Sequence, residues 1–195
     1  MSQLVLATRN KGKLKEIQSL LSGIPFEIIS VEDFAEVPEV EEDGATMEDN
    51  ALKKARTVFS FTHLPTLSDD SGLEVYALGM RPGVISARYS GEGATYASNN
   101  KKLLLELNNV PPENRRAQFR CVVAYVTKDL EQTFEGVCEG TILTEQRGIG
   151  GFGYDPLFLP NGYNQTFAEL PLDVKNKISH RAKAFNLIKN RLISL

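Results

Sequence analysis

Apolar residues follow two different spacings along this chain, and the two spacings alternate. Short apolar or alternating runs are typical of β-strands, whereas apolar residues at every third or fourth position are typical of amphipathic helices. The strand-like runs cover residues 3–7, 26–31, 64–78, 119–125 and 134–142, and the helical runs cover 14–21, 51–59, 94–107 and 172 onward. This mixture predicts one α/β unit built on a mixed sheet.

Polar and glycine-rich stretches mark where the predicted elements end. The polar residues 68–72 interrupt the third strand-like run. Thr46, with Asp49 three residues later, has the pattern of a capped helix start. The segments 79–93 and 147–160 are dense in glycine, so we expect each to form a shaped loop.

The composition narrows the class of protein. Of 195 residues, 42% are hydrophobic and 24% are charged, which is typical of a soluble globular protein. The length predicts a single domain, 1–195, without a separable linker. The formal net charge is −3, so we expect no nucleic-acid partner, and any phosphate must be held by a local site. No apolar run approaches the roughly 20 residues that span a bilayer, so we expect a cytoplasmic chain without a membrane partner.

Cysteine and histidine are too scarce for a zinc site. Cys121 and Cys138 form no CxxC pair, and we expect both to be buried free thiols. His63 and His180 are the two histidines, and the chain has no tryptophan. The chemistry of the protein must therefore rest on carboxylates, amides and cations.

A polar loop between the first predicted strand and helix has the features of a phosphate site. Thr8, Asn10 and Lys13 lie where free backbone N–H groups and the helix dipole favour an anion. Lys54, on the second predicted helix, could reach the same anion, although an exposed lysine is the commoner outcome. The loop lacks the Walker A pattern, and a solvated basic helix start explains it equally well.

Two acidic clusters form a candidate metal centre. Asp69 and Asp70 end the first half of a strand-like run, and Glu41, Glu42 and Asp43 form the second cluster. Adjacent strand residues point to opposite faces, so one aspartate is the working group and the other braces the turn. One carboxylate from each cluster would suffice for Mg²⁺, which takes further oxygens from phosphates. Turn-forming aspartates and a solvated acidic loop are the alternative interpretation.

The third candidate site is aromatic. Glycines at 148, 150, 151 and 153 surround Phe152, which allows the ring to be held outside regular structure. Such a ring could stack on a base, although a bulge whose aromatics fill the core fits the spacing equally well. His180 and Arg181 near the last helix could donate to a carbonyl oxygen on a base edge, although a lone histidine at such a place is more often a surface or cap residue than a ligand.

Five segments together resemble one family, the inosine/xanthosine triphosphate pyrophosphatases, which are RdgB-like hydrolases of non-canonical purine nucleotides. The segments that carry the resemblance are Thr8-Arg9-Asn10-Lys11-Gly12-Lys13, Ser68-Asp69-Asp70-Ser71-Gly72-Leu73, Pro82-Gly83-Val84-Ile85-Ser86-Ala87-Arg88-Tyr89-Ser90-Gly91, Gly151-Phe152-Gly153-Tyr154-Asp155-Pro156 and Ser179-His180-Arg181. Their order and spacing match from residue 4 to about 190.

The resemblance implies an elongated mixed-sheet α/β fold with flanking helices, in which two lobes enclose a central cleft, and it implies a homodimer that uses Mg²⁺. Carried over by position, Asp70 is the proton acceptor and a metal ligand, and Glu41, chosen over Glu42 by counting from neighbouring residues, is the second metal carboxylate. The implied substrate-binding residues are Thr8, Arg9, Asn10, Lys11, Gly12, Lys13, Ser71, Phe152, Gly153, Tyr154, Asp155, Lys175, His180 and Arg181.

The reaction that we expect is hydrolysis of ITP, dITP and XTP to the monophosphate and pyrophosphate, which clears deaminated purines from the nucleotide pool. A 6-keto purine presents an acceptor at O6 and a donor at N1, whereas adenine reverses both, so donors from His180 and Arg181 would disfavour ATP. Two alternatives stay open: a nucleotide sensor that does not turn its ligand over, and a phosphatase that releases orthophosphate.

Overall fold

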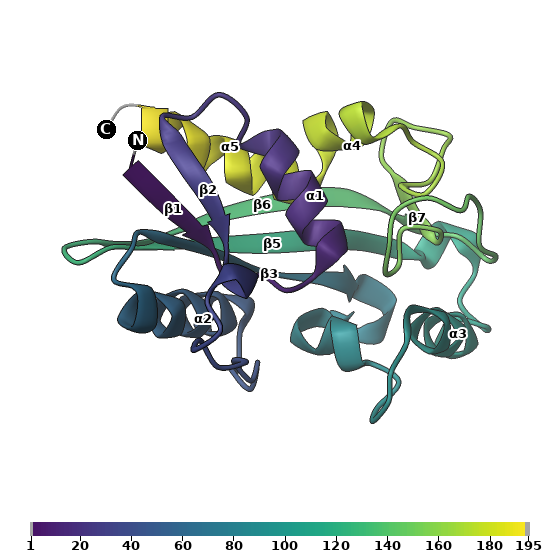
Figure 1. Ribbon diagram of the computed structural model, residues 1–195. Helices are drawn as coiled ribbons and strands as arrows, with labels where there is room; N and C mark the ends of the chain where they lie inside the picture. Colours follow the sequence, from purple (N-terminus) through teal and green to yellow (C-terminus); the bar gives the residue numbers. More distant parts are fainter. Residues whose placement is uncertain (1, 194–195) are drawn as a thin grey trace. The chain divides into compact units, whose positions relative to one another are not determined.

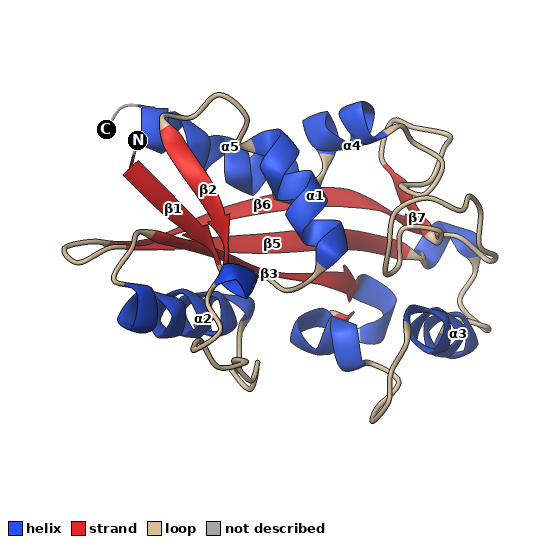
Figure 2. Ribbon diagram, in the orientation of Figure 1, coloured by secondary structure: helices blue, strands red, loops and turns tan. Residues whose placement is uncertain are grey.

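The computed structural model describes residues 2–193 and shows strands flanked by helices (Figures 1 and 2). The strands are β1 (Ser2–Leu6), β2 (Phe26–Ser30), β3 (Thr66–Val75), β4 (Arg81–Pro82), β5 (Arg116–Val126), β6 (Glu131–Ile142) and β7 (Phe158–Pro160). The helices are α1 (Lys11–Leu20), α2 (Met47–Thr62), α3 (Tyr96–Glu106), α4 (Leu172–Ile178) and α5 (His180–Ile193), with 3₁₀ turns at Val31–Asp33, Tyr76–Leu78, Gly83–Arg88 and Pro112–Asn114. No helix in residues 2–193 is both long and apolar enough to cross a membrane.

The strands form one sheet in the order β2-β1-β3-β5-β6-β7, and β4 pairs with β3. Strand β1 runs parallel to both β2 and β3, with Leu4 opposite Ile28 and Leu6 opposite Leu67. Strand β7 is antiparallel to β6, and β4 is antiparallel to β3. The sheet is therefore mixed, and the expected α/β class with flanking helices is confirmed.

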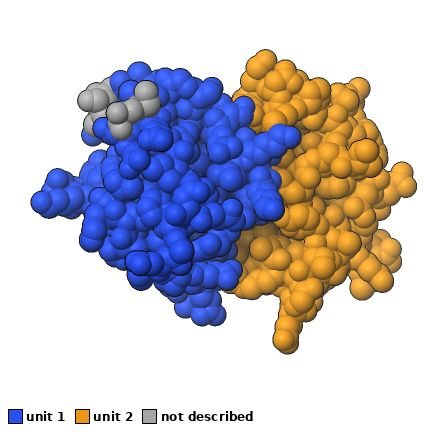
Figure 3. Space-filling model, viewed as in Figure 1, with its two compact units in different colours: residues 1–70, 121–136, 181–195 blue, residues 71–120, 137–180 orange. Residues whose placement is uncertain are grey.

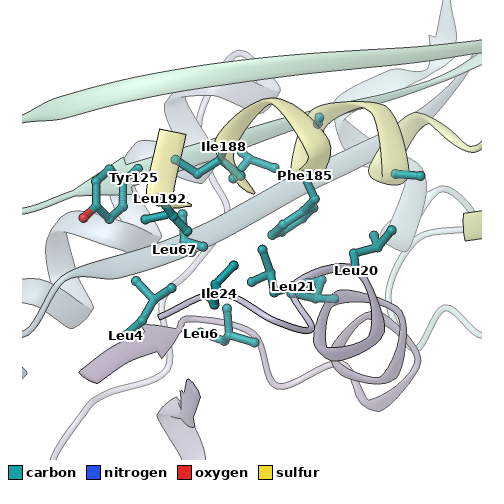
Figure 4. Packing of buried hydrophobic residues seen from close by; sticks show 14 of the residues in the cluster. Leu4, Leu6, Leu20, Leu21, Ile24, Leu67, Tyr125, Phe185, Ile188 and Leu192 are labelled. Carbon is teal, nitrogen blue, oxygen red and sulfur yellow. The ribbon is translucent and has the colours of Figure 1, made fainter. Parts of the chain in front are cut away.

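The chain divides into two compact units, coloured separately in Figure 3. Unit 1 comprises the described residues of 1–70, 121–136 and 181–195, and unit 2 comprises 71–120 and 137–180. Each unit has its own apolar cluster. In unit 1, Leu4, Leu6 and Leu67 from the sheet pack with Phe185 and Ile188 of α5 (Figure 4). In unit 2, the cluster includes Leu73, Leu103, Phe119, Phe158 and Phe167.

Two helix starts that carry candidate site residues are fixed by side-chain caps. The Asn10 side chain accepts from the backbone N–H groups of Gly12 and Lys13 at the start of α1. Thr46 and Asp49 form a reciprocal capping box at the start of α2, as the sequence predicts. These caps satisfy N–H groups that a helix end otherwise leaves without partners.

Two elements differ from the sequence prediction. Strand β3 continues through residues 68–72, where the polar run predicted an interruption, because Ser68, Asp69 and Asp70 are all buried beside polar partners from neighbouring elements. The last predicted helix is broken at Ser179, whose backbone is extended (φ −67°, ψ 158°), so that α5 starts afresh at His180. The helical spacing of apolar residues continues across this break and therefore hides it.

Candidate active site

The loop that joins β1 to α1 is held in shape by its own polar side chains. Asn10 Oδ1 accepts hydrogen bonds from the N–H groups of Gly12 at 2.9 Å and Lys13 at 3.1 Å. Thr8 Oγ1 accepts from the Asn10 N–H at 3.3 Å. Arg9 Nη2 donates to the carbonyl of Val37 at 2.9 Å. These hydrogen bonds thus fix the backbone position of Lys13, and Arg9 links the loop to the segment that contains Val37.

Lys13 forms an ion pair with a completely buried aspartate. Its Nζ lies 3.1 Å from Asp69 Oδ2, and the Asp69 side chain is 0% exposed. Burial alone would raise the pKa of Asp69, but the charges of Lys13, Arg181 and Lys54 together hold this pKa well below its ordinary value. Burial likewise acts against the charge of Lys13, yet Asp69 keeps the pKa of Lys13 above its ordinary value. Both groups are therefore ionised at neutral pH.

Arg181 joins the same buried network from the first turn of α5. Its Nη1 donates to Glu16 Oε2 of α1 at 2.5 Å, and its Nε lies 3.4 Å from Asp69 Oδ2. The side chain is 2% exposed, so the two carboxylates compensate the desolvation of the guanidinium. The sequence hypothesis gives Arg181 a contact with the base edge, whereas the structure shows it bound to Glu16 and Asp69.

Asp70 is buried on β3 beside Asn50 of α2. Asn50 Nδ2 donates to Asp70 Oδ2 at 3.2 Å, and Asn50 Oδ1 accepts from the Gly44 N–H at 2.7 Å. Burial raises the pKa of Asp70, although the charges of Lys13 and Lys54 act against that rise. The raised pKa favours a carboxylate that can take up a proton more readily than an exposed aspartate.

Lys54 and Glu42 complete the charged cluster of unit 1. Lys54 Nζ donates to the Asp69 carbonyl at 2.6 Å and also pairs with Glu42 Oε1. Glu42 is close enough for its charge to act on Asp70, whereas Glu41 is exposed. The structure therefore places Glu42, and not the predicted Glu41, in this cluster.

The candidate residues of unit 2 gather around the loop that holds Phe152. Asp155 Oδ2 accepts from the Phe152 N–H at 2.9 Å and from Lys175 Nζ at 2.5 Å. Lys175 Nζ also lies 5.1 Å from the centre of the Phe152 ring. Gly151 has φ +69°, and a Cβ there would lie 2.1 Å from Asp155 Oδ2. Asp155 and Lys175 therefore close the loop, which only glycine at 151 permits.

The two aromatic residues of this loop have different surroundings. Tyr154 is buried, and its hydroxyl donates to the carbonyl of Ser86 at 2.8 Å. Phe152 is partly exposed. The core-filling interpretation thus holds for Tyr154, whereas Phe152 is only partly buried. Gly153, between them, has φ +62°.

His180 lies in the aromatic part of unit 2. Its ring stacks on Phe119 with centroids 4.7 Å apart and an interplanar angle of 12°. It is 3% exposed. Stacking and burial fix the ring orientation, so the edge of the imidazole is presented in one direction only.

The other residues that the sequence singles out lie at the following places. Lys11 and Gly12 are the first two residues of α1, and Ser71 follows Asp70 as the first residue of unit 2. Cys121 and Cys138 are both buried and free, as predicted. His63 ends α2 in a left-handed backbone conformation.

The oxygen donors of unit 1 suit a hard divalent cation. Within residues 2–193, no three or more His, Cys, Asp and Glu side chains are arranged so that they could hold a metal ion. Mg²⁺ does not need such a group, because it is held by one or two carboxylates together with water and phosphate oxygens. Asp70 and Glu42, with the Asn50 amide beside Asp70, match that donor set.

Two residues of the unit 1 cluster, Asn50 and Glu16, lie outside the sequence-predicted site, and Glu42 was named there only as the alternative to Glu41. Asn50 and Lys54 are four residues apart on one face of α2, and that spacing was the available signal for Asn50. Glu16 is a buried acidic residue on the apolar side of α1, next to Ile17. An acid at a core position signals a buried cationic partner, but the sequence does not say which one.

Comparison with known proteins gives full-length matches. The Ham1 family model matches residues 4–191. A protein of Geobacter sulfurreducens named dITP/XTP pyrophosphatase is 55% identical over 193 residues, covering 98% of this chain and 97% of that protein. A protein of Desulforamulus reducens with the same name is 52% identical over 194 residues, covering 97% and 96%. The solved HAM1 protein of Coxiella burnetii is 41% identical, with a TM-score of 0.91 and complete coverage of both chains.

Proposed function

The chain belongs to the Ham1 family, and we propose that it is a nucleoside triphosphate pyrophosphatase for non-canonical purines. The relatives named dITP/XTP pyrophosphatase support dITP and XTP as substrates. ITP is proposed with them because it carries the same base as dITP. The products are the monophosphate and pyrophosphate, and the enzyme acts on the free nucleotide pool of the cytoplasm.

The observation that carries this proposal is the buried carboxylate of Asp70 among cations. Asp70 is 5% exposed, is held by Asn50, and lies within the electrostatic range of Lys13 and Lys54. A carboxylate needed only for solubility would face water, because burying it costs free energy. We assign Asp70 as the general base that takes a proton from the water attacking the α-phosphorus.

Asn50 and the cations give Asp70 two properties that a base needs. The hydrogen bond from Asn50 Nδ2 fixes the orientation of the Asp70 carboxylate, which we assign to orient the attacking water. Burial raises the pKa of Asp70, which brings its proton affinity closer to the working pH, and the charges of Lys13 and Lys54 act against that rise.

Mg²⁺ is the metal that we propose, held by Asp70 and Glu42. It would neutralise phosphate charge and so stabilise the leaving pyrophosphate. The other cations of the site come from the chain. Lys13 at the start of α1, and Lys54 on α2, provide positive charge for the triphosphate, and the loop Thr8–Lys13 provides the helix N-terminus.

The nucleoside part of the substrate is assigned to the residues of unit 2. The Phe152 ring stacks on the purine, and Asp155 and Lys175 hold the loop that carries it. His180 is the proposed donor to the base edge. We assign Arg181 an indirect role in substrate binding, because its guanidinium binds Glu16 and Asp69.

Incubation of the purified protein with ITP, dITP, XTP, ATP and GTP, followed by anion chromatography, tests the proposal. We expect pyrophosphate and monophosphate only when Mg²⁺ is present, and at least a hundredfold preference for dITP over ATP. Release of orthophosphate would identify a phosphatase instead. Binding without any product would identify a nucleotide sensor.

Hydrolysis in ¹⁸O-labelled water locates the attacked phosphorus. Attack at the α-phosphorus puts the label into the monophosphate, whereas attack at the β-phosphorus puts it into pyrophosphate. We expect the label in the monophosphate.

We propose that the enzyme is a homodimer, on the basis of the family resemblance. Multi-angle light scattering coupled to gel filtration should give twice the chain mass of 21.6 kDa. A mass equal to that of one chain would contradict this assignment.

A further inference from the structure

Helix α3 lies against the Phe152 loop through two residues that are one helical turn apart. Tyr96 and Asn100 are at positions i and i+4, which places both on the same face of α3. The Tyr96 ring centre lies 6.2 Å from that of Phe152, with an interplanar angle of 41°. Asn100 Nδ2 donates to the carbonyl of Gly153 at 3.0 Å. Helix α3 thus contacts the loop both at a side chain, the Phe152 ring, and at its backbone, the Gly153 carbonyl.

The two contacts differ in exposure. Asn100 is 3% exposed, so its hydrogen bond to Gly153 is shielded from water. Asn100 Nδ2 also lies 3.4 Å from Gln146 Oε1, at the other end of the glycine-rich segment. Tyr96 is 49% exposed, which is a large aromatic surface to leave in water. Packing on Phe152 removes part of that surface from water and fixes the tilt of the two rings.

Helix α3 is a rigid support for these contacts. Thr95 and Ser98 form a capping box at its first turn, and Leu103 and Leu107 anchor it in the apolar cluster of unit 2. The Phe152 loop, by contrast, has no regular structure between residues 147 and 157. The loop is held from its own C-terminal side by Asp155 and Lys175. On its N-terminal side, the Gly150 N–H donates to the carbonyl of Ala168 at 3.0 Å. Of these contacts, the ones from α3 are those that reach the Phe152 ring and the Gly153 backbone at the tip of the loop.

We infer that Tyr96 and Asn100 are positioning residues that orient the Phe152 ring for stacking on the purine base. The inference rests on the proposed function, because it gives these residues a part in recognising the nucleoside. Neither residue acts on the phosphates or on the attacking water. Loss of either should therefore weaken nucleotide binding while leaving the chemical step intact.

The test uses the variants Tyr96→Ala and Asn100→Asp. Asn100→Asp keeps the size of the side chain but replaces the donor to the Gly153 carbonyl with an acceptor. We expect each variant to raise the KM for dITP about tenfold and to leave kcat within about twofold. Inorganic tripolyphosphate, which has no base, should inhibit both variants and the wild type with the same inhibition constant.

Two further variants separate positioning from general damage to α3. Tyr96→Phe keeps the ring and should restore the wild-type KM within about twofold. Leu105→Ala removes an apolar side chain that is 73% exposed on the same helix, and it should change neither KM nor thermal stability. Thermal unfolding of all variants shows whether they are folded at the assay temperature.

The outcomes are distinguishable. An unchanged KM for dITP in both Tyr96→Ala and Asn100→Asp, with an active wild type, overturns the inference and leaves the proposed function standing. A parallel rise in the inhibition constant for tripolyphosphate also overturns it, because the damage would then reach the phosphate residues. A wild type that neither binds nor hydrolyses any purine nucleotide overturns the proposed function and this inference with it.

Discussion

The candidate residues of unit 1 and unit 2 are built in contrasting ways. In unit 1, charged side chains are buried: Lys13, Asp69, Arg181 and Glu16 form a chain of ion pairs with two positive and two negative groups. In unit 2, an aromatic ring is presented by a glycine-rich loop, with one buried ion pair, Asp155–Lys175, closing that loop. The arrangement in unit 1 holds charged groups at fixed positions, and the arrangement in unit 2 holds an aromatic ring in a fixed place.

The contrast follows from the two parts of the proposed substrate. A triphosphate carries charge that must be met by cations at fixed places, and cations that are removed from water need counter-ions to remain there. A purine offers a flat apolar face, which any suitably placed ring can meet. We therefore expect substitutions in unit 1 to change the rate of reaction or the stability of the fold, and those around Phe152 to change nucleotide affinity.

The largest effect is expected from Asp70→Asn. The amide cannot take the proton from water, so kcat should fall by about 10²- to 10⁴-fold while the KM changes little. Steady-state kinetics with dITP measures both constants. Asp129→Asn, in the exposed turn between β5 and β6, is the matched control and should keep wild-type rates. Near wild-type kcat in Asp70→Asn would remove Asp70 from the mechanism.

The next largest effect is expected from Asp69→Asn. This substitution removes the negative charge that faces both Lys13 and Arg181, and breaking a buried ion pair on one side costs about 3–5 kcal/mol. Urea unfolding gives the change in the free energy of unfolding. Asp43→Asn removes the acid of an exposed pair with Lys53 and should cost less than about 1 kcal/mol. Equal effects of the two substitutions would show that burial of the network contributes nothing.

The contribution of this ion-pair network to the stability of the wild type should also be lost at acid pH. Because the pKa of Asp69 is lower in the folded protein than its ordinary 3.8, the stability that Asp69 contributes is complete above pH 3.8 and is lost as the pH falls below it. Between pH 7 and pH 2, the wild type should therefore lose about 2 kcal/mol more than Asp69→Asn. Urea midpoints measured across this range give the difference, and identical pH profiles would contradict the lowered pKa.

A smaller effect, on affinity, is expected from Gly151→Ala in unit 2. The added methyl would meet Asp155 Oδ2, so the loop must open and Phe152 must move. We expect the KM for dITP to rise about tenfold at nearly constant kcat. Gly162→Ala is the control, because Gly162 also has a positive φ, +83°, but has open space around its Cβ position. A comparable KM in both variants would mean that the Asp155 contact does not shape the loop.

The pattern of apolar residues predicted which helices and strands form better than it predicted where they are interrupted. The spacing of Leu14, Ile17 and Leu20 gave α1, and Thr46 with Asp49 gave the start of α2. The polar run 68–72 was wrongly taken as a break in a strand, because the cations that allow Asp69 and Asp70 to be buried come from α1, α2 and α5. The break at Ser179 was missed because the apolar spacing continues through it.

Candidate site residues could be proposed from motifs in the sequence, whereas the contacts between them could not. Lys13, Asp70 and Phe152 stand in recognisable motifs. The choice of Glu42 over Glu41 depends on Lys54, which is twelve residues further along the chain. The attachment of Arg181 to Glu16 joins residues that are 165 positions apart. Local spacing carries no information about such pairs, and only the fold brings their charges together.

The division of work between the two units is tested most directly by comparing Asp70→Asn with Phe152→Ala. For each variant, kcat and KM are measured with dITP, and the inhibition constant is measured with tripolyphosphate. We predict that Asp70→Asn lowers kcat at least a hundredfold with little change in KM, and that Phe152→Ala raises KM about tenfold or more while kcat and the inhibition constant stay within about twofold. A fall in kcat of similar size in both variants, or a loss of tripolyphosphate inhibition in Phe152→Ala, would contradict this division.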